Sequence, residues 1–595
     1  MPTTKIIHGI SIIICVCALN QMAFASQPTD PDINIQLRDA ATQGTAADAR
    51  ALLKAGADVN AQCSELWTAL MYTVHFNDDP ELVSTLLDEG ADVNAKNIHG
   101  VTVLMLAVDG MKFSDQDINT NLLIVNALIK AGANVNHRHN SGESALSIAT
   151  KARNNPAVIK ALIVAGADSH MRDRFGYTPL MNAAYRHSNK SISELLDDGA
   201  NVNARSNDKS TALMAAAFSN NDSQVIQTLL DSGADINAAR DDGSTSLMAA
   251  AEGNESTEVI QTLLLAGADI NARRNDGVSA LMCAAGFSEN PKIIVALVDA
   301  GANVDATDLN GWTPLMFAAG ATSRTYYSWC NDEPTELISL IGNGKNIDTR
   351  SKAGYTALMF AAQSGNPKII KTLARKGADV NAQLPGGYTP LMIAAAVHPS
   401  DEAISALVQA GADVNAQADD GTTALMLAIA QCRFTETVDA LLQAGAQPNM
   451  LRKGGYTPLM YAAMRGPNSW KNEQVIASLL KMGAEVNTQN DEGLTALMFS
   501  MHPTAEPEDS LIYEPTPMAS ERINWKRRSR NWCGGVRTNE IFTNADVLGL
   551  LLHAGANAKL NDNTGKTALD YAKQTEFLRD LQHTKAYKKL VNATN

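Results

Sequence analysis

The sequence predicts an all-α solenoid of stacked helix-turn-helix repeats that are joined by short hairpin fingers. The first observation is a motif of the form Gly-Ala-Asp-Val-Asn-Ala, which occurs in fourteen copies whose first glycines are mostly 34 residues apart. The second is a motif of the form Thr-Ala/Pro-Leu-Met-x-Ala-Ala, whose Thr or Ser always stands twelve residues after that glycine. A fixed period of about 20 to 50 residues is typical of repeat proteins, in which each unit packs only on its neighbours.

Each repeat carries the signals of two short helices. Thr313 before Pro314 pairs a residue that caps helix N-termini with the residue best suited to the first helical position. In the segment 225–230, apolar pairs one turn apart predict a second helix with a single apolar face. Gly233 can end that helix in the left-handed conformation, and the Asp-Asp-Gly tip at 241–243 is typical of a hairpin turn. Neither helix can bury its apolar face alone, so we expect each repeat to stack on the next.

These motifs resemble those of the ankyrin-repeat family, whose signature reads D-x-x-G-x-T-P-L-H-x-A-A, then V-x-x-L-L, then G-A-D-V-N-A. The resemblance extends from about residue 33 to the C-terminus and comprises about fifteen units, including a degenerate cap at each end. Two departures are the 34-residue spacing, one more than the family's, and Met in place of the family's His, as at Met181, Met214, Met316 and Met392. We expect both to be packing variants, with Met removing a polar contact. The resemblance implies a non-catalytic protein-binding scaffold that grips its partner on a concave face lined by hairpin tips and first helices.

The first 25 residues have the form of a secretory signal. A polar start is followed by the apolar stretch 10–19 and by an Ala-Phe-Ala site at 23–25, which predicts cleavage after Ala25. The apolar stretch is shorter than the roughly 20 residues of a membrane-spanning helix, so we expect no stable membrane insertion. A lipoprotein anchor at Cys15 or Cys17 is the alternative. The mature protein is therefore expected to be periplasmic or secreted.

The expected organisation has a single repeat domain with four interruptions. It comprises a signal peptide at 1–25, a short linker at 26–32, and an ankyrin-repeat solenoid at 33–595 with insertions near 109–120, 320–335, 465–472 and 501–544. The largest insertion ends in a basic and aromatic segment, which is a candidate docking loop for an acidic partner. Its residues are Arg522, Trp525, Lys526, Arg527, Arg528, Arg530 and Trp532. The alternative is a flexible loop whose charges are simply solvated.

The residue just before each repeat's Thr or Ser forms a row that should lie on the partner-binding face. Several members are aromatic, and exposed aromatic side chains are typical anchors of protein interfaces. The candidates for partner binding are Trp312, Tyr355, Tyr388, Tyr456, Trp67 and Tyr177. In the alternative interpretation, each ring packs against a neighbouring hairpin.

Bulk charge and residue patterns argue against several other function classes. The net charge of -15 disfavours nucleic-acid binding, which needs clustered Lys and Arg, so we expect an unidentified protein partner and a monomeric chain. The cysteines after the signal are far apart and odd in number, which fits neither a disulfide framework nor a zinc site. A disulfide between Cys330 and Cys533, each of which follows a Trp within an insertion, stays open.

The sequence contains no catalytic, cofactor-binding or metal-binding motif that can be distinguished from the repeat pattern. His137, His139 and His170 occupy neighbouring hairpins but lack further ligands at metal-binding spacing. We therefore predict no enzyme activity, no cofactor and no metal. The rival interpretations are a secreted effector that binds a host protein, and an enzyme whose site lies in the 501–544 insertion with His502 and Cys533.

Overall fold

The computed structural model describes most of the repeat region of the chain. The described residues are 33–109, 118–152, 156–186, 189–288, 290–320, 340, 347–397, 401–430, 435–464, 472–501, 545–574 and 581–594. The predicted signal peptide, the linker and most of each predicted insertion lie outside this part of the chain. In the described part, the secondary structure is helical, with only isolated bridges at three hairpins.

The chain divides into two compact units, and α12 (Ala212–Ser219) is shared between them. The first unit comprises Met1–Ala216 and Gln224–Asp235, and the second comprises Ala217–Ser223 and Ile236–Asn595. The helices of the first unit are α2 Ile33–Gln43, α3 Ala46–Lys54, α4 Ala69–Tyr72 with the π-helical turn η2 Thr73–Asn77, α5 Pro80–Asp88, α6 Val103–Asp109, α7 Ile118–Lys130, α8 Ala145–Ala149, α9 Pro156–Val164, α10 Pro179–Arg186, α11 Asn189–Asp197 and α13 Ser223–Asp231.

In the second unit, the first helices of successive repeats alternate with the second helices. The first helices are α14 Ser246–Gly253, α16 Ala280–Phe287, α18 Pro314–Ala319, α20 Ala357–Ser364, α22 Pro390–Val397, α24 Ala424–Ala430, α26 Pro458–Met464, α28 Ala496–Met501 and α31 Ala568–Gln574. The second helices are α15 Thr257–Leu265, α17 Lys292–Asp299, α21 Pro367–Arg375, α23 Asp401–Gln409, α25 Thr435–Gln443, α27 Asn472–Lys481 and α30 Ala545–His553, and α33 Lys585–Thr594 closes the unit.

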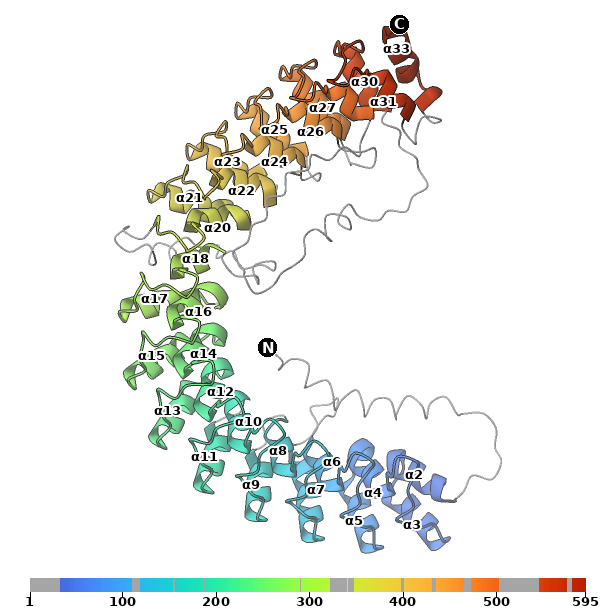
Figure 1. Cartoon of the computed structure of the whole chain (residues 1–595). Coiled ribbons are helices and arrows are strands. Elements are labelled where there is room, and N and C mark those ends of the chain that lie inside the picture. Colours follow the sequence, from blue (N-terminus) through green and yellow to red (C-terminus); the bar gives the residue numbers. More distant parts are fainter. Residues whose placement is uncertain are drawn as a thin grey trace. The chain divides into compact units, whose positions relative to one another are not determined.

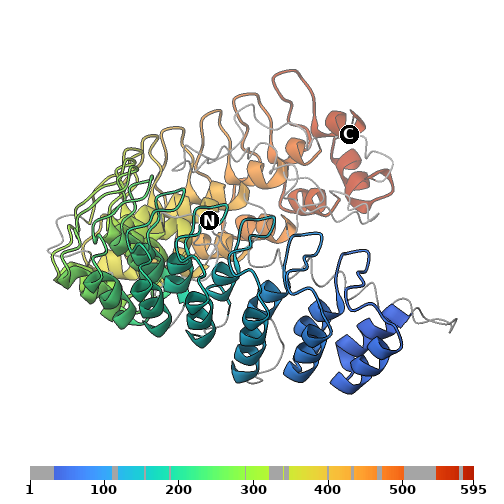
Figure 2. The same ribbon diagram turned by 90° about the horizontal axis from the view of Figure 1, so that it is seen from below.

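Like helices pack on like helices within each unit. In the second unit, α20 packs on α22 and α22 on α24, while α21 packs on α23 and α23 on α25, so the two kinds of helix form two rows (Figure 1). The hairpins that join the repeats of this unit project from one side of the helices (Figure 2). The core is aliphatic, with the Ala, Leu and Met residues of the first helices almost fully buried. The prediction of an all-α solenoid of stacked repeats is confirmed.

The local signals of the repeat act as the sequence predicts, with one correction. The Thr313 side chain caps α18 by accepting the backbone N–H of Met316, and Gly233 adopts a positive φ of 86° after α13. Met316 is buried, which confirms its role in packing. However, its Sδ accepts the Thr313 N–H at 3.5 Å, and Met359 and Met460 do the same in their own repeats. The expectation that Met removes a polar contact was therefore wrong for these repeats, because sulfur serves as a weak acceptor.

The hairpins are tied to one another by a ladder of backbone hydrogen bonds. In most of the described hairpins, the second residue donates its N–H to the carbonyl of the third residue of the preceding hairpin, as from Lys352 to Asn310 at 2.9 Å and from Asp491 to Gly454 at 3.0 Å. The residue that follows the accepting carbonyl, the fourth of the hairpin, is usually glycine, and Gly176 shows why. Its φ is 79°, and a Cβ there would lie 2.8 Å from the backbone nitrogen of Asn207 in the following hairpin.

The asparagine that most copies of the Gly-Ala-Asp-Val-Asn motif carry forms a second ladder. Asn381 donates its Nδ2 hydrogen to the carbonyl of Gly411 at 3.2 Å and accepts the Asp413 N–H on Oδ1 at 2.8 Å. The same pair of bonds starts from Asn60, Asn94, Asn136, Asn203, Asn237, Asn415, Asn449 and Asn487. An amide both donates and accepts, so it can satisfy the carbonyl that ends the next repeat's second helix and a backbone N–H just beyond it.

The described residues contain no candidate membrane span. None of the helices there combines the length and the apolar character that crossing a bilayer requires.

Candidate protein-binding surface

The row of residues that stand just before each repeat's capping Thr or Ser lies at the end of each hairpin, where the chain enters the first helix. Trp312, for example, offers its carbonyl to the N–H of Asp308 at 3.0 Å, and Asp308 Oδ1 accepts the Trp312 N–H at 2.7 Å. These bonds close the hairpin and place the side chain of the row residue beside the first helix of its own repeat. The row is therefore a fixed structural position, repeated once per unit.

Trp312 and Tyr355 are buried, which corrects the expectation that they are exposed. Their relative exposures are 6% and 4%. The Trp312 ring lies 5.8 Å from the ring of Phe317 and 5.6 Å from that of Phe360, and Tyr355 stacks on Phe360 at 5.2 Å. The alternative interpretation, in which each ring packs against its neighbours, holds for this pair because first-helix aromatic residues cover them.

Trp67 is also buried, in an aromatic cluster at the start of the first unit. Its exposure is 6%, and its ring lies 5.4 Å from Tyr72 and 6.3 Å from Phe76. Phe76 belongs to η2 and is itself 42% exposed. The prediction of an exposed Trp67 was wrong, and the accessible aromatic side chain of this cluster is Phe76, which the repeat pattern did not single out.

Tyr177, Tyr388 and Tyr456 are half-buried, so these three members of the row keep an accessible face. Tyr456 packs on Tyr461 at 5.8 Å and on Phe499 at 5.9 Å through its ring. Burial raises the pKa of Tyr388, and the nearby Asp420 carboxylate raises it further. The phenols of Tyr388 and Tyr456, whose pKa burial raises, stay neutral at physiological pH and can serve as hydrogen-bonding groups at an interface.

An ion pair lies near Tyr388 and joins two hairpins of the second unit. Arg452 Nε is 2.8 Å from Asp420 Oδ2, and Arg452 donates a further hydrogen bond from Nη1 to the Tyr461 hydroxyl at 2.9 Å. Burial alone would raise the pKa of Asp420, but hydrogen bonds from Thr422 and Arg452 together with the Arg452 charge hold it below its usual value. We refer to Tyr388, Asp420, Arg452 and Tyr461 as the Asp420 site.

Exposed apolar side chains stand on several hairpins. Phe175, Leu309 and Leu451 are 38%, 60% and 50% exposed, although the backbone around each is held by the hairpin ladder. A contact made by such a side chain orders little additional backbone, because the hairpin is already fixed.

Several hairpin arginines form structural clamps. Arg273 donates from Nη1 to the carbonyl of Thr307 in the next repeat at 2.6 Å, and Arg350 does the same to Gln383 at 2.6 Å. Arg138 and Arg172 reach forward in the same way in the first unit. Much of the basic charge seen along the hairpins therefore satisfies backbone carbonyls of neighbouring repeats.

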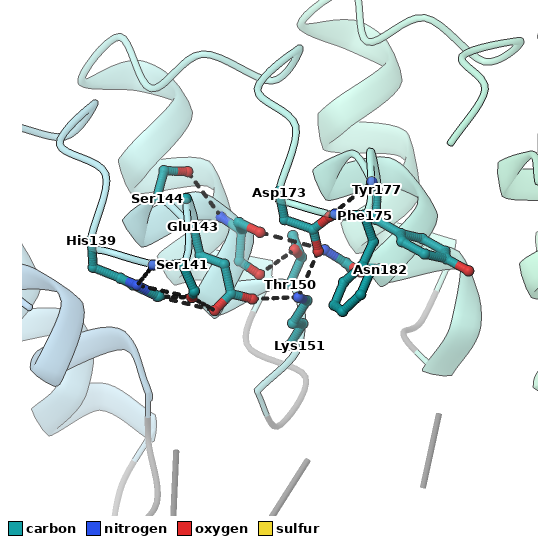
Figure 3. A network of polar contacts seen from close by, with 12 residues as sticks. His139, Ser141, Glu143, Ser144, Thr150, Lys151, Asp173, Phe175, Tyr177 and Asn182 are labelled. Carbon is teal, nitrogen blue, oxygen red and sulfur yellow. Dashed lines mark hydrogen bonds and ion pairs between the residues drawn. The ribbon is translucent and has the colours of Figure 1, made fainter. Parts of the chain in front are cut away.

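A buried polar network joins two hairpins of the first unit (Figure 3). His139 Nε2 lies 3.0 Å from Glu143 Oε2, Lys151 forms an ion pair with the other oxygen of Glu143, and the same Lys151 lies 3.1 Å from Asp173. Burial opposes ionisation of Glu143, but the His139 hydrogen bond and the Lys151 charge lower its pKa to about 2. At Asp109, burial together with the Glu143 charge raises the pKa of the carboxyl to about 6, an effect that the His139 charge reduces.

The structure separates the three histidines considered as a metal site. His139 faces Glu143, whereas His137 Nε2 lies 3.0 Å from the carbonyl of Gly100 and His170 lies beside Asp168. Across the described residues, no group of three potential ligands could hold a metal ion. The sequence placed Glu143 in the row, but the partnership with Lys151 and Asp173 depends on packing between repeats.

Some predicted residues lie outside the described part of the chain. These are the docking-loop residues Arg522, Trp525, Lys526, Arg527, Arg528, Arg530 and Trp532, and the pair Cys330 and Cys533. Cys63 and Cys283 are described, and both are free thiols. Burial raises the pKa of Cys283 to about 12, so this thiol is unreactive in the folded protein.

Comparison with known proteins identifies the repeat. The family model described as "Ankyrin repeats (3 copies)" matches residues 37–139, 116–205, 146–240, 247–327, 326–418 and 395–490, which is well over half of the chain. Among solved structures, the human ASB11 ankyrin repeat domain is similar at 25% sequence identity, with 39% of this chain and 98% of that chain covered and a TM-score of 0.34. No curated protein matches the chain.

Proposed function

The chain belongs to the ankyrin-repeat family, and from this premise we propose that it is a non-catalytic scaffold that binds a protein partner in an extracytoplasmic compartment. The proposed contact surface of each unit consists of its hairpin tips and its half-buried row tyrosines, which are Tyr177 in the first unit and Tyr388 and Tyr456 in the second. One observation carries the proposal: accessible tyrosine and apolar side chains stand on hairpins whose backbone is already fixed by two ladders of hydrogen bonds. Tyrosine is enriched at protein interfaces because its ring combines apolar area with a hydrogen-bonding group.

Affinity capture with matched variants tests the surface. Wild-type protein and the double variant Tyr388→Ser/Tyr456→Ser would be used to capture partners from the compartment in which the protein resides. We expect the variant to lose the partner. The control is Leu265→Ser, which removes a 90% exposed apolar side chain at the end of a second helix. Equal capture by wild type and the tyrosine variant would refute this surface.

The proposed compartment rests on the sequence of the first 25 residues. Cell fractionation and N-terminal sequencing of the mature protein test it, with Ser26 expected as the first residue and the periplasm or the medium as the location. Protein found in the medium and bound to a host target would favour the secreted-effector alternative. Retention in the cytoplasm with Met1 intact would contradict export.

A further inference from the structure

Three exposed arginines lie on two successive hairpins of the first unit. Arg138 and Arg172 each stand just before a hairpin, and Arg174 is the second residue of the hairpin at 173–176. Arg138 donates from Nη2 to the backbone carbonyl of Arg172. A Cβ on Gly142 would lie 3.2 Å from Arg138 Nη2 and 3.7 Å from the backbone nitrogen of Arg174. The Arg138 guanidinium therefore lies beside the hairpin that carries Arg174.

The bonds that these arginines make do not cancel their charge. Arg138 and Arg172 donate to backbone carbonyls of the following repeat, which carry no net charge. Among the residues that the structure describes, none of the three arginines forms an ion pair. The buried carboxylates of the same hairpins, Glu143 and Asp173, pair with Lys151 instead. The exposed side of these hairpins is therefore basic, although the whole chain has a net charge of -15.

Exposed carboxylates in the flanking segments already have other partners. Asp168 Oδ1 lies 3.5 Å from His170 Nδ1 and accepts the His170 N–H at 2.8 Å. Asp208, in the following hairpin, accepts hydrogen bonds from the hydroxyls of Ser206 and Ser210. Neither carboxylate pairs with any of the three arginines. The chain therefore leaves these guanidinium groups available to a negatively charged ligand.

Arg174 is held in place by a stacking contact with the next residue. Its guanidinium carbon lies over the Phe175 ring, 4.7 Å from the ring centre, and Phe175 is 38% exposed. Asn207 of the following hairpin fixes the backbone of both residues, because its N–H donates to the Phe175 carbonyl at 3.0 Å and its Nδ2 donates to the Arg174 carbonyl at 3.1 Å. A ring against the face of a guanidinium leaves the N–H groups at its edge free to donate.

Two hairpin arginines of the second unit have carboxylates of the chain itself as partners. Arg274 pairs with Asp276 of its own hairpin, and Arg452 pairs with Asp420 in the Asp420 site. The Arg174 side chain, by contrast, contacts only the Phe175 ring among the described residues. A guanidinium binds a carboxylate through two parallel N–H donors, and both remain available on Arg174.

We propose that Arg138, Arg172, Arg174 and Phe175, which we call the arginine patch, bind an acidic segment of the protein partner. A carboxylate of that segment accepts from Arg174, the other two guanidinium groups attract a second carboxylate, and a neighbouring apolar side chain packs on Phe175. This inference rests on the proposed scaffold function and names the chemistry of one contact. An acidic protein segment fits better than a nucleic acid, because three arginines on an acidic chain are too short a cluster for a phosphate backbone.

Two short peptides provide the test with the full-length protein. The probe is a rhodamine-labelled peptide amide of the form Gly-Leu-Glu-Glu-Leu-Gly, and the reference peptide has Gln in place of both Glu residues. Fluorescence anisotropy should show that the acidic peptide binds about tenfold more tightly, the combined effect of two or three exposed charge pairs. The preference should fall as salt is added, since ionic screening weakens the attraction between exposed charges.

Three variants locate the binding. Arg174→Gln should remove most of the preference for the acidic peptide. Lys352→Gln is the matched control, because Lys352 is exposed at the same hairpin position in the second unit but is followed by Ala353. This control removes the same charge and should keep the tenfold preference. Phe175→Ala should weaken the binding of both peptides several-fold, since both contain leucine. Circular dichroism would verify that the variants are folded.

Several outcomes would overturn the inference. They are equal binding of the two peptides, an unchanged preference in Arg174→Gln, an equal loss in the Lys352→Gln control, and unchanged affinities in Phe175→Ala. A short single-stranded DNA that binds more tightly than the acidic peptide at the same salt concentration, and loses affinity in Arg174→Gln, would identify a phosphate site instead.

The chain's own acidic insertion is the remaining rival occupant. Peptide binding that appears only after Glu506, Glu508 and Asp509 are replaced by Gln or Asn would overturn the inference, since that insertion would then fill the patch. The peptide assay is independent of partner capture through Tyr388 and Tyr456, so the proposed scaffold function can survive the failure of the arginine patch.

Discussion

Asp348 accepts the backbone N–H of Asp379 at 2.9 Å, in the place where asparagine forms the ladder in most repeats. Its carboxylate has no proton with which to reach the carbonyl of Gly377, which the amide of an asparagine would satisfy. This repeat therefore has half of the bridge that Asn381 makes to Gly411 and Asp413.

We predict that Asp348→Asn strengthens this connection between repeats by about 0.5–1 kcal/mol, the net contribution of one added hydrogen bond. Hydrogen exchange measured by mass spectrometry should show slower exchange in the segment 376–382. The reverse change, Asn381→Asp, should speed exchange around 410–414. If both variants exchange like wild type, the asparagine ladder does not stabilise the stack.

Leu66 offers a stabilising change at a strained position. It stands where most hairpins have glycine, and its φ is 61°. Left-handed backbone costs a side chain-bearing residue roughly 1–2 kcal/mol, partly offset by the greater freedom of glycine in the unfolded chain. Leu66→Gly should therefore raise the unfolding midpoint of the first unit in a thermal scan. Leu66→Ala keeps the strain and should give no such increase.

Asp109 should make the stability of the first unit depend on pH. Its pKa of about 6 in the folded protein exceeds the ordinary value of 3.8, so folding favours the protonated form. Its contribution is favourable at low pH and is lost as the pH rises through about 6. Asp109→Asn should thus stabilise the unit at pH 7.5 by on the order of 2 kcal/mol, with little effect at pH 4. Urea unfolding at both values measures this, and a pH-independent difference would exclude the charge as its cause.

Glu143 should show the opposite pH dependence. Its pKa of about 2 lies below the ordinary 4.5, so its contribution is present above pH 4.5 and is lost as the pH falls toward 2. Glu143→Gln should destabilise the first unit at pH 7 and have a much smaller effect at pH 3. Urea unfolding of this variant at the two pH values would contradict the role of Lys151 and His139 if the loss were the same at both.

Variants of Phe360 and Tyr388 should distinguish a residue needed for packing from one needed for partner binding. Phe360 is 1% exposed and contacts the rings of Trp312 and Tyr355, so Phe360→Ala should cost about 3–5 kcal/mol through the cavity it leaves. Tyr388→Ala removes a half-buried ring and should cost much less stability while weakening partner capture. Thermal unfolding monitored by tryptophan fluorescence compares the two, and equal destabilisation would show that Tyr388 is mainly structural.

The fold could be predicted because the period, the Thr caps and the glycines each act within one repeat or between adjacent repeats. Thr313 and Gly233 behave in the structure as their local sequence indicates. Exposure along the row could not be predicted in the same way. Trp312 is covered by Phe317 and by Phe360 of the next repeat, and this cover depends on which side chain each first helix presents.

Polar contacts between side chains of different repeats also could not be predicted from the repeat motif. Nothing in the motif indicates that Arg452 pairs with Asp420 from the preceding hairpin, or that Lys151 bridges Glu143 and Asp173. A signal was available in one case: in most of the bridged repeats, the motif's asparagine stands 30 residues before the next repeat's glycine. Only the stacked structure shows that its amide contacts that glycine's carbonyl.

The asparagine ladder has a consequence for how such a chain can change its length. Asn60, Asn136 and Asn415 each reach a glycine 30 residues further on and a backbone N–H 32 residues further on. Where the spacing is kept, an in-frame duplication or loss of one whole repeat recreates the same pair of bonds at the new junction. Recombination between repeats can therefore lengthen or shorten this protein in steps of one repeat without loss of the bridge.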